Sequence, residues 1–156
     1  MTFAREEAAD DLFREAFAKP DAGPRLRAIE AAALLADAEI VRLIARGLDD
    51  KEVGVQKAAI EALRFNEHKK SLDELHARAK KKAAKEDLPV YATLLRAIGQ
   101  HGSPTSLEIL SDNPWSTPDA QVIEAKILGL SRIRTKEALK ALTDLIAGTN
   151  PGEAGE

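Results

Sequence analysis

The residues of this chain best suited to bind a metal ion or to move a proton are its three histidines, His68, His76 and His101. A zinc site needs several ligands at a spacing that brings them together, such as two histidines four residues apart on one helix face. No two of these histidines have that spacing, and the chain contains no cysteine. The sequence therefore predicts no metal site and no cofactor, and His76, next to an apolar leucine, is interpreted as a partly buried structural residue.

Carboxylates follow one another directly at several points, as in Glu6-Glu7, Asp49-Asp50 and Asp73-Glu74. General acid–base catalysis needs two such groups facing one site, but neighbours on a helix point to different faces. We interpret these pairs as solvated surface charges. The sequence also has no glycine-rich phosphate loop, no nucleophile elbow and no histidine-based triad pattern, so we predict that the protein is not an enzyme.

Bases form the densest charge feature of the chain. Between residues 69 and 86 there are seven lysines and arginines against three acids, although the whole chain has a net charge of -3. Bases in the last turn of a helix complement its dipole, which would make this a solvated helix face. Contact with phosphate, RNA or an acidic partner is the alternative, although no interleaved aromatic residues are present to stack on bases. The candidate basic patch consists of Lys69, Lys70, Lys80, Lys81, Lys82 and Lys85.

The composition predicts one all-α domain over residues 1–156. Hydrophobic residues make up 44% of the chain but aromatics only 4%, so small and aliphatic side chains must fill the core, which suits closely packed helices. No stretch approaches the roughly 18 apolar residues of a membrane span, and acids stand at the N-terminus where a secretory signal carries bases. We expect a soluble, cytoplasmic protein with no membrane partner.

The apolar residues recur with a period of 31 to 35 residues, which is typical of stacked helix pairs. In the first helix of each pair the aligned residues are Ile29, Ile60, Leu95 and Ile127, each followed two residues later by a small residue, Ala31, Ala62, Ala97 or Gly129. In the second helix they are Leu43, Leu75, Leu110 and Leu142, each preceded three residues earlier by Ile40, Leu72, Leu107 or Leu139.

Turn residues divide the chain into the predicted elements. A helix over 3–19, with Thr2 as its N-cap, ends at Pro20 and caps the stack. Four helix pairs follow over 24–147, and the second helix of the second pair is expected to continue to Lys85. A loop over 111–119 contains the single tryptophan, Trp115, and residues 148–156 form a flexible tail.

Three segments carry a resemblance to a known family. Residues 95–110 and 128–142 are similar to the joint between the two helices of bacterial HEAT repeats, and residues 50–63 resemble the opening of such a repeat. HEAT openings often have an arginine after the valine, whereas here Gln56 and Ile123 follow Val55 and Val122, and only Leu26-Arg27 keeps the arginine. The tryptophan, glycine and tyrosine pattern of tetratricopeptide repeats is missing. The resemblance implies a right-handed α-solenoid whose second helices line a concave surface.

The resemblance also implies a scaffold or protein-binding role without naming the partner. Arg46 and Arg78 share one repeat position, so we expect them to form a ladder on neighbouring second helices, where they either shield the groove or accept an anion. Trp115 either fills a gap between repeats or anchors a partner. The candidate partner-binding residues are Arg42, Arg46, Glu74, Arg78 and Trp115.

Two other functions are compatible with the resemblance. HEAT-like alkylpurine DNA glycosylases grip DNA on a basic face near an acid and aromatic residues, for which Asp112 and Trp115 offer a slight parallel, and nucleic-acid binding is therefore the alternative. HEAT-like phycobilin lyases suggest a third role, as a lyase or chaperone for a tetrapyrrole-bearing protein, without any supporting local motif.

Overall fold

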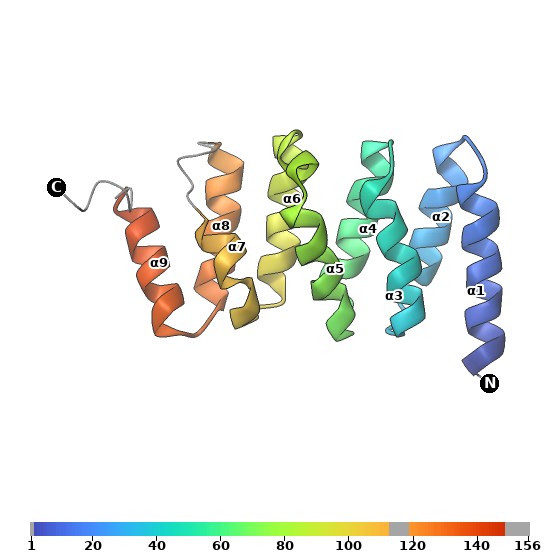
Figure 1. Cartoon of the computed structure of the whole chain (residues 1–156), viewed down its shortest axis with the longest axis horizontal. Coiled ribbons are helices and arrows are strands. Elements are labelled where there is room, and N and C mark those ends of the chain that lie inside the picture. Colours follow the sequence, from blue (N-terminus) through green and yellow to red (C-terminus); the bar gives the residue numbers. More distant parts are fainter. Residues whose placement is uncertain (1, 113–118, 149–156) are drawn as a thin grey trace. The chain divides into compact units, whose positions relative to one another are not determined.

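In the computed structural model, residues 2–112 and 119–148 are described, and these ranges contain helices and no strand (Figure 1). The prediction of an all-α fold is confirmed. By its internal contacts the chain divides into two compact units, residues 1–78 and 79–156. The single domain over 1–156 stays a prediction. Trp115 and the predicted tail beyond residue 148 lie outside the described residues.

The first unit is a group of antiparallel helices packed around aliphatic side chains. Helix α2 contacts α1 and α4, and α3 contacts α1 and α4, so these four helices enclose one core. Phe13, Leu43, Ile44 and Leu63 are completely buried in it. The elements, in chain order, are α1 (Thr2–Phe17), α2 (Ala22–Ala32), α3 (Ala38–Ala45), the 3-10 helix η1 (Arg46–Asp49), α4 (Val53–Arg64) and the first part of α5 (Lys69–Lys80).

Short polar residues begin the helices of this unit. The Asp21 side chain accepts a hydrogen bond from the Gly23 amide, and Asp37 Oδ1 accepts one from the Glu39 amide at 2.8 Å. These bonds satisfy amides that a helix start leaves without an intrahelical partner. The turn that the sequence predicts at Pro20 is therefore confirmed.

The second unit has its closest packing between α6 and α8. A Cβ placed on Gly99 of α6 would lie 2.6 Å from the Gly129 Cα of α8, so the two backbones meet without intervening side chains. Leu94, Leu95, Ile98 and Leu110 are buried around this contact. The elements are the 3-10 helix η2 (Lys82–Lys85), α6 (Leu88–Gln100), the 3-10 helix η3 (Pro104–Ser106), α7 (Leu107–Ser111), α8 (Ala120–Arg132) and α9 (Lys136–Ile146).

Three predicted helix boundaries are wrong. The N-terminal helix ends at Phe17 and begins at Thr2, which is therefore its first residue and not a cap outside it. The helix predicted to continue to Lys85 ends at Lys80, because Lys81 is extended (φ -71°, ψ 134°) before η2 begins. Continuing the helix would bring bases together at positions four apart, and the break instead buries Ala84.

The predicted apolar periodicity holds best in the middle of the chain. Leu43, Leu75 and Leu110 are completely buried, as the alignment predicts. The last pair departs from it, since Leu142 is only half-buried and Leu139 is 64% exposed on a helix that no later described helix covers. Ala31 is also exposed, and the small residues that α2 buries are Ala28 and Ala32. The expected small-residue position is therefore wrong in the first pair.

Candidate functional site

A buried ion pair joins α2 to the turn that precedes α4. Arg25 Nε donates to Asp50 Oδ2 at 2.7 Å and Arg25 Nη2 donates to Asp50 Oδ1 at 3.0 Å. The two side chains are only 4% and 6% exposed. Such a two-pronged contact satisfies both carboxylate oxygens with fixed geometry. The interpretation of Asp49-Asp50 as solvated charges is therefore wrong for Asp50, which spacing alone could not match with an arginine 25 residues away.

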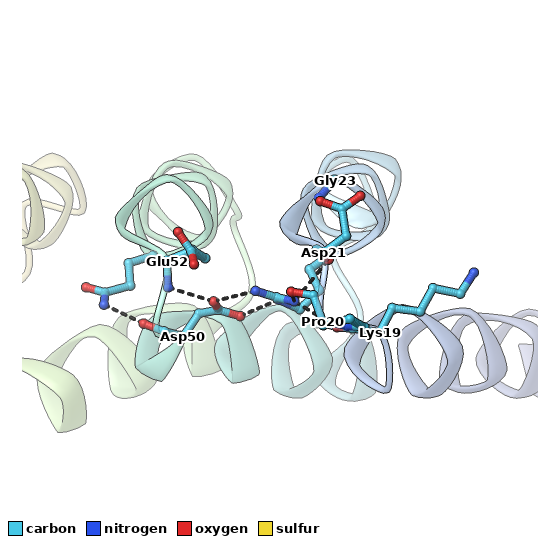
Figure 2. A network of polar contacts seen from close by, with 8 residues as sticks. Lys19, Pro20, Asp21, Gly23, Asp50 and Glu52 are labelled. Atoms are coloured by element: carbon cyan, nitrogen blue, oxygen red, sulfur yellow. Dashed lines mark hydrogen bonds and ion pairs between the residues drawn. The ribbon is translucent and has the colours of Figure 1, made fainter.

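The third guanidinium nitrogen, Nη1, holds the segment that follows α1 (Figure 2). Arg25 Nη1 donates to the carbonyl oxygens of Lys19, Pro20 and Asp21 at 3.0 to 3.3 Å. Asp50 Oδ1 in turn accepts from the Glu52 amide, at the start of α4. Since the guanidinium and the carboxylate are both occupied by partners within the chain, the arrangement is a structural clamp and not a ligand site.

Arg42 and Arg46, predicted to bind a partner, both lie at the surface of α3 and η1. Arg42 Nε donates to Glu39 Oε1 at 2.9 Å, and this bond lowers the pKa of Glu39. Arg46 lies over the Phe17 ring, with its guanidinium carbon 5.0 Å from the ring centroid. A role for these two arginines in binding stays a prediction.

Arg78 has a different environment from Arg46, although the two share one repeat position. Its side chain is 11% exposed, and its Nε donates to the Leu48 carbonyl at 2.9 Å and lies 3.6 Å from Asp49 Oδ1. The guanidinium thus donates a hydrogen bond to a carbonyl near the C-terminal end of η1. Glu74, on the same helix, is half-buried. Trp115 lies outside the described residues.

The candidate basic patch falls into two groups. Lys69 and Lys70 are exposed at the beginning of α5, and the Lys70 amide donates to His68 Nδ1 at 3.2 Å. The other group belongs to the second unit and lines a depression of about 460 Å³ at the end of α5 and along η2. Its bases are Lys80, Lys81, Lys82 and Lys85.

Acids and a tyrosine from α6 and α7 line the other side of this depression. Lys85 Nζ lies 3.1 Å from Asp112 Oδ2, and this hydrogen bond raises the pKa of Lys85. Burial raises the pKa of Tyr91, whose ring lies beneath the Lys85 ammonium at 5.9 Å. Because Glu108 also lines the depression, four bases face two acids and the surface is moderately cationic.

A buried lysine lies behind Asp112 and was not identified from the sequence. Lys126 is 2% exposed, and its Nζ donates to the Asp112 backbone carbonyl at 2.8 Å. Removal of the ammonium from water lowers the pKa of Lys126. In the sequence Lys126 looks like a surface base of an amphipathic helix, because no local pattern indicates its burial.

The first unit leaves two large apolar side chains in solvent near the ends of α2 and α4. Leu34 is 93% exposed and Phe65 is 64% exposed. Both border a hollow of about 370 Å³, whose floor is formed by small and aliphatic residues of the two helices. The lining consists of Ile29, Glu30, Ala33, Leu34, Ala58, Glu61, Ala62 and Phe65.

Leu34 also borders a second hollow, of about 240 Å³, between the start of α1 and the turn before α3. Its apolar lining is completed by Leu35, Ala36 and Ile40, and its charged residues are Arg5, Glu6 and Asp37. Leu34 is thus a ridge shared by two apolar hollows. We name this surface the Leu34 groove. The periodicity did not predict it, because Leu34 and Phe65 follow the last turns of their helices.

The described residues contain no group of three or more histidines, aspartates or glutamates placed to hold a metal ion. In the same part of the chain, no helix has both the length and the apolar character needed to cross a membrane. Comparisons of the sequence with protein-family models and with curated proteins gave no match.

Proposed function

We propose that this chain is a noncatalytic protein-binding module, built as a right-handed α-solenoid of HEAT-like helix pairs. The observation that supports this best is the Leu34 groove, where a 93% exposed leucine and a 64% exposed phenylalanine border adjoining apolar hollows. Large apolar side chains gathered beside a hollow are typical of surfaces that bind another protein.

The free energy available for binding comes from the same two side chains. Full burial of a leucine or phenylalanine that was previously in water contributes about 1.5 to 3 kcal/mol each. Leu34 and Phe65 contribute little of this to folding, since both remain largely exposed. A partner that covers them would gain most of that free energy, which is enough to make them the principal contacts of a moderate-affinity complex.

The Leu34 groove differs from the surface that the family resemblance favours. In a HEAT-like arrangement α2 and α4 are first helices and belong to the outer side, whereas Arg42 and Arg46 belong to second-helix segments that would line the concave side. The arginine surface with Arg42, Arg46, Glu74 and Arg78 therefore remains the second binding surface to test. Arg46 on Phe17 and Arg78 on Leu48 are already engaged within the unit, which favours the Leu34 groove.

A peptide-display selection against the whole chain tests the proposed function, whichever partner sequence the protein prefers. We expect enriched peptides whose binding is lost in the double variant L34A/F65A and retained in R42A/R46A. The matched control is L139A, because Leu139 is as exposed as Phe65 but lies on α9. Loss of binding in R42A/R46A alone would favour the concave surface, and a selection without enriched peptides would contradict a protein-binding role.

Binding of a nucleic acid is the second candidate function, supported by the lysines around the depression at η2. Phosphate contacts make affinity fall steeply with salt. In a gel-shift assay with single- and double-stranded RNA and DNA, the variant K80Q/K81Q/K82Q should then lose binding, whereas K19Q/K57Q/K136Q should retain it. The absence of a shift at low salt in the unmodified protein would remove this candidate.

A further inference from the structure

We propose that the Leu34 groove binds a basic amphipathic helix that places one apolar side chain on each side of Leu34. The inference rests on the proposed protein-binding function and adds the chemistry of the partner. It follows from two separate properties of the groove, its division by Leu34 and the sign of its charged rim.

The division of the groove requires two anchors on the partner. Leu34 lines both hollows, which have volumes of about 370 and 240 Å³, so a single side chain cannot fill them together. A helix presents apolar residues at i, i+3 or i+4, and i+7 along one face, and this spacing leaves a gap between successive side chains. The Leu34 side chain can occupy that gap, where a partner would bury it on both sides.

The rim of the groove is acidic. Glu30 and Glu61 line the larger hollow and Glu6 and Asp37 line the smaller one, whereas among the described residues Arg5 is the only base in either lining. This acidic rim surrounds an apolar floor, so the complementary surface is apolar in the middle and basic at its edges. Anionic lipid, the other common apolar partner, would be repelled by the same carboxylates.

Glu30 also favours a basic partner, because its position is unfavourable for the isolated unit. It lies near the end of α2, where the helix dipole favours a cation, and the last turn of α2 contains no base. Within the ranges 2–112 and 119–148, no ion pair is formed by its carboxylate. A lysine or arginine of a bound helix would meet both this carboxylate and the negative end of α2.

Glu61 and Phe65 indicate how the groove would bind such a base. Arg64 Nη1 lies 3.3 Å from Glu61 Oε1, and its guanidinium carbon lies 4.9 Å from the Phe65 ring centroid. The chain thus already stacks one guanidinium on the Phe65 ring beside an acid. The rest of the exposed phenylalanine remains available to a partner's apolar or cationic side chain.

The test uses a fluorescein-labelled, alanine-based helical peptide with leucines at i, i+4 and i+7 and lysines at the flanking positions. Fluorescence anisotropy with the full chain measures its affinity at low salt. The comparison peptide has the same leucines but glutamates in place of the lysines. We expect the lysine peptide to bind at least about tenfold more tightly than the glutamate peptide, a difference that added salt reduces.

Variants of the groove test its apolar side chains and its acidic rim separately. L34A/F65A should weaken binding of the lysine peptide by about 30-fold or more, as loss of principal contacts does. E30Q/E61Q should weaken it about fivefold to tenfold while leaving the apolar floor intact. The matched controls are L139A for the apolar pair and E15Q for the acids, since Leu139 and Glu15 are exposed and line neither hollow.

The outcomes distinguish this inference from the proposed function. If L34A/F65A weakens both peptides equally and E30Q/E61Q weakens neither, the groove binds proteins but the basic partner is wrong. Failure of the lysine peptide to bind also overturns the basic helix, and the display selection then decides separately whether the groove binds proteins. Binding of phosphatidylserine vesicles that depends on Leu34 would replace the helix by a membrane.

Discussion

The two units hold neighbouring helices together by different interactions. In the first unit a buried arginine with five hydrogen bonds links α2, the end of α1 and the start of α4. In the second unit α6 and α8 meet backbone to backbone at Gly99 and Gly129, and the buried Lys126 donates to a loop carbonyl. The helices of the first unit are thus linked by a buried ion pair, whereas α6 and α8 of the second unit are linked by the close approach of two glycines.

This difference shows that burial of a base does not reveal its contribution to stability. Arg25 and Lys126 are 4% and 2% exposed, which is almost the same burial. Arg25 has a carboxylate and three carbonyls to replace the lost water, but the ammonium of Lys126 donates to a neutral carbonyl oxygen of Asp112. We therefore expect their removal to have very different effects on stability, with the larger loss at Arg25.

Replacement of Arg25 should break the first unit most severely. Arg25→Met leaves the Asp50 carboxylate buried without its partner, and we expect a loss of about 3 to 5 kcal/mol in the free energy of unfolding. Urea denaturation followed by circular dichroism measures this loss. The double variant R25M/D50L removes both charges and should recover much of the stability. A single variant as stable as the unmodified protein would contradict the role of the clamp.

Substitution of the glycine contact should have the next largest effect. In Gly99→Ala the new Cβ would lie 2.6 Å from the Gly129 Cα, and a backbone cannot move aside as a side chain can. In Gly47→Ala of the first unit, the new Cβ would lie 2.7 Å from the flexible end of Ile29, at Cδ1, and 2.9 Å from the Ala59 Cβ, which moves only with its helix. We expect thermal denaturation to show losses of about 3 kcal/mol for G99A and a smaller loss, of about 2 kcal/mol, for G47A, where one of the two overlaps can be relieved by a side-chain rotation. Equal losses would show that the two joints are packed alike.

Replacement of Lys126 should change the stability little. Lys126→Met keeps the length of the side chain and removes the cost of burying an ammonium, while it gives up one hydrogen bond to a backbone oxygen. The two effects oppose each other, so the free energy of unfolding should stay within about 1 kcal/mol of the unmodified value in urea denaturation. A loss as large as that of R25M would mean that the two buried bases are equivalent.

The smallest expected effect is a dependence of stability on pH that comes from Lys126. Burial lowers the pKa of Lys126 in the folded chain below the ordinary value of 10.5, so the unfolded chain binds more protons in the range between these two pKa values. Stability should therefore rise with pH below 10.5, by less than about 1.4 kcal/mol per pH unit, the limit for one proton.

Urea denaturation between about pH 8 and about pH 9.5 measures this slope below the ordinary pKa values of tyrosine and lysine. The K126M variant should lack the part of this slope that comes from Lys126. An unchanged slope in K126M would show that another group causes it.

The sequence predicts the helices well because their signals are local. Asp37 and Asp119 begin helices by accepting hydrogen bonds from amides two or three residues away, and a period of about 32 residues identifies Leu43, Leu75 and Leu110 as buried. The break at Lys81 was missed because every residue from 77 to 85 is compatible with a helix. Ala84 is buried on η2, which packs against α6, and this contact cannot be recognised from residues 77–85 alone.

The candidate sites could be predicted less well, because they depend on contacts between distant residues. Arg25 and Lys126 look like ordinary surface bases of amphipathic helices, because the carboxylate that pairs with Arg25 lies 25 residues away and the carbonyl that binds Lys126 lies 14 residues away. Leu34 and Phe65 look like the last apolar residues of two core stripes. Their exposure results from the end of each helix, which carries the side chain past the edge of the core.

The three carbonyls held by Arg25 have a consequence for the chain between α1 and α2. Residues 18–21 are exposed, and such a turn would normally be a site of proteolytic cleavage. A protease must draw several residues into an extended form, which here requires the guanidinium to release the carbonyls of Lys19, Pro20 and Asp21. Limited digestion should therefore spare this accessible turn until the whole first unit opens.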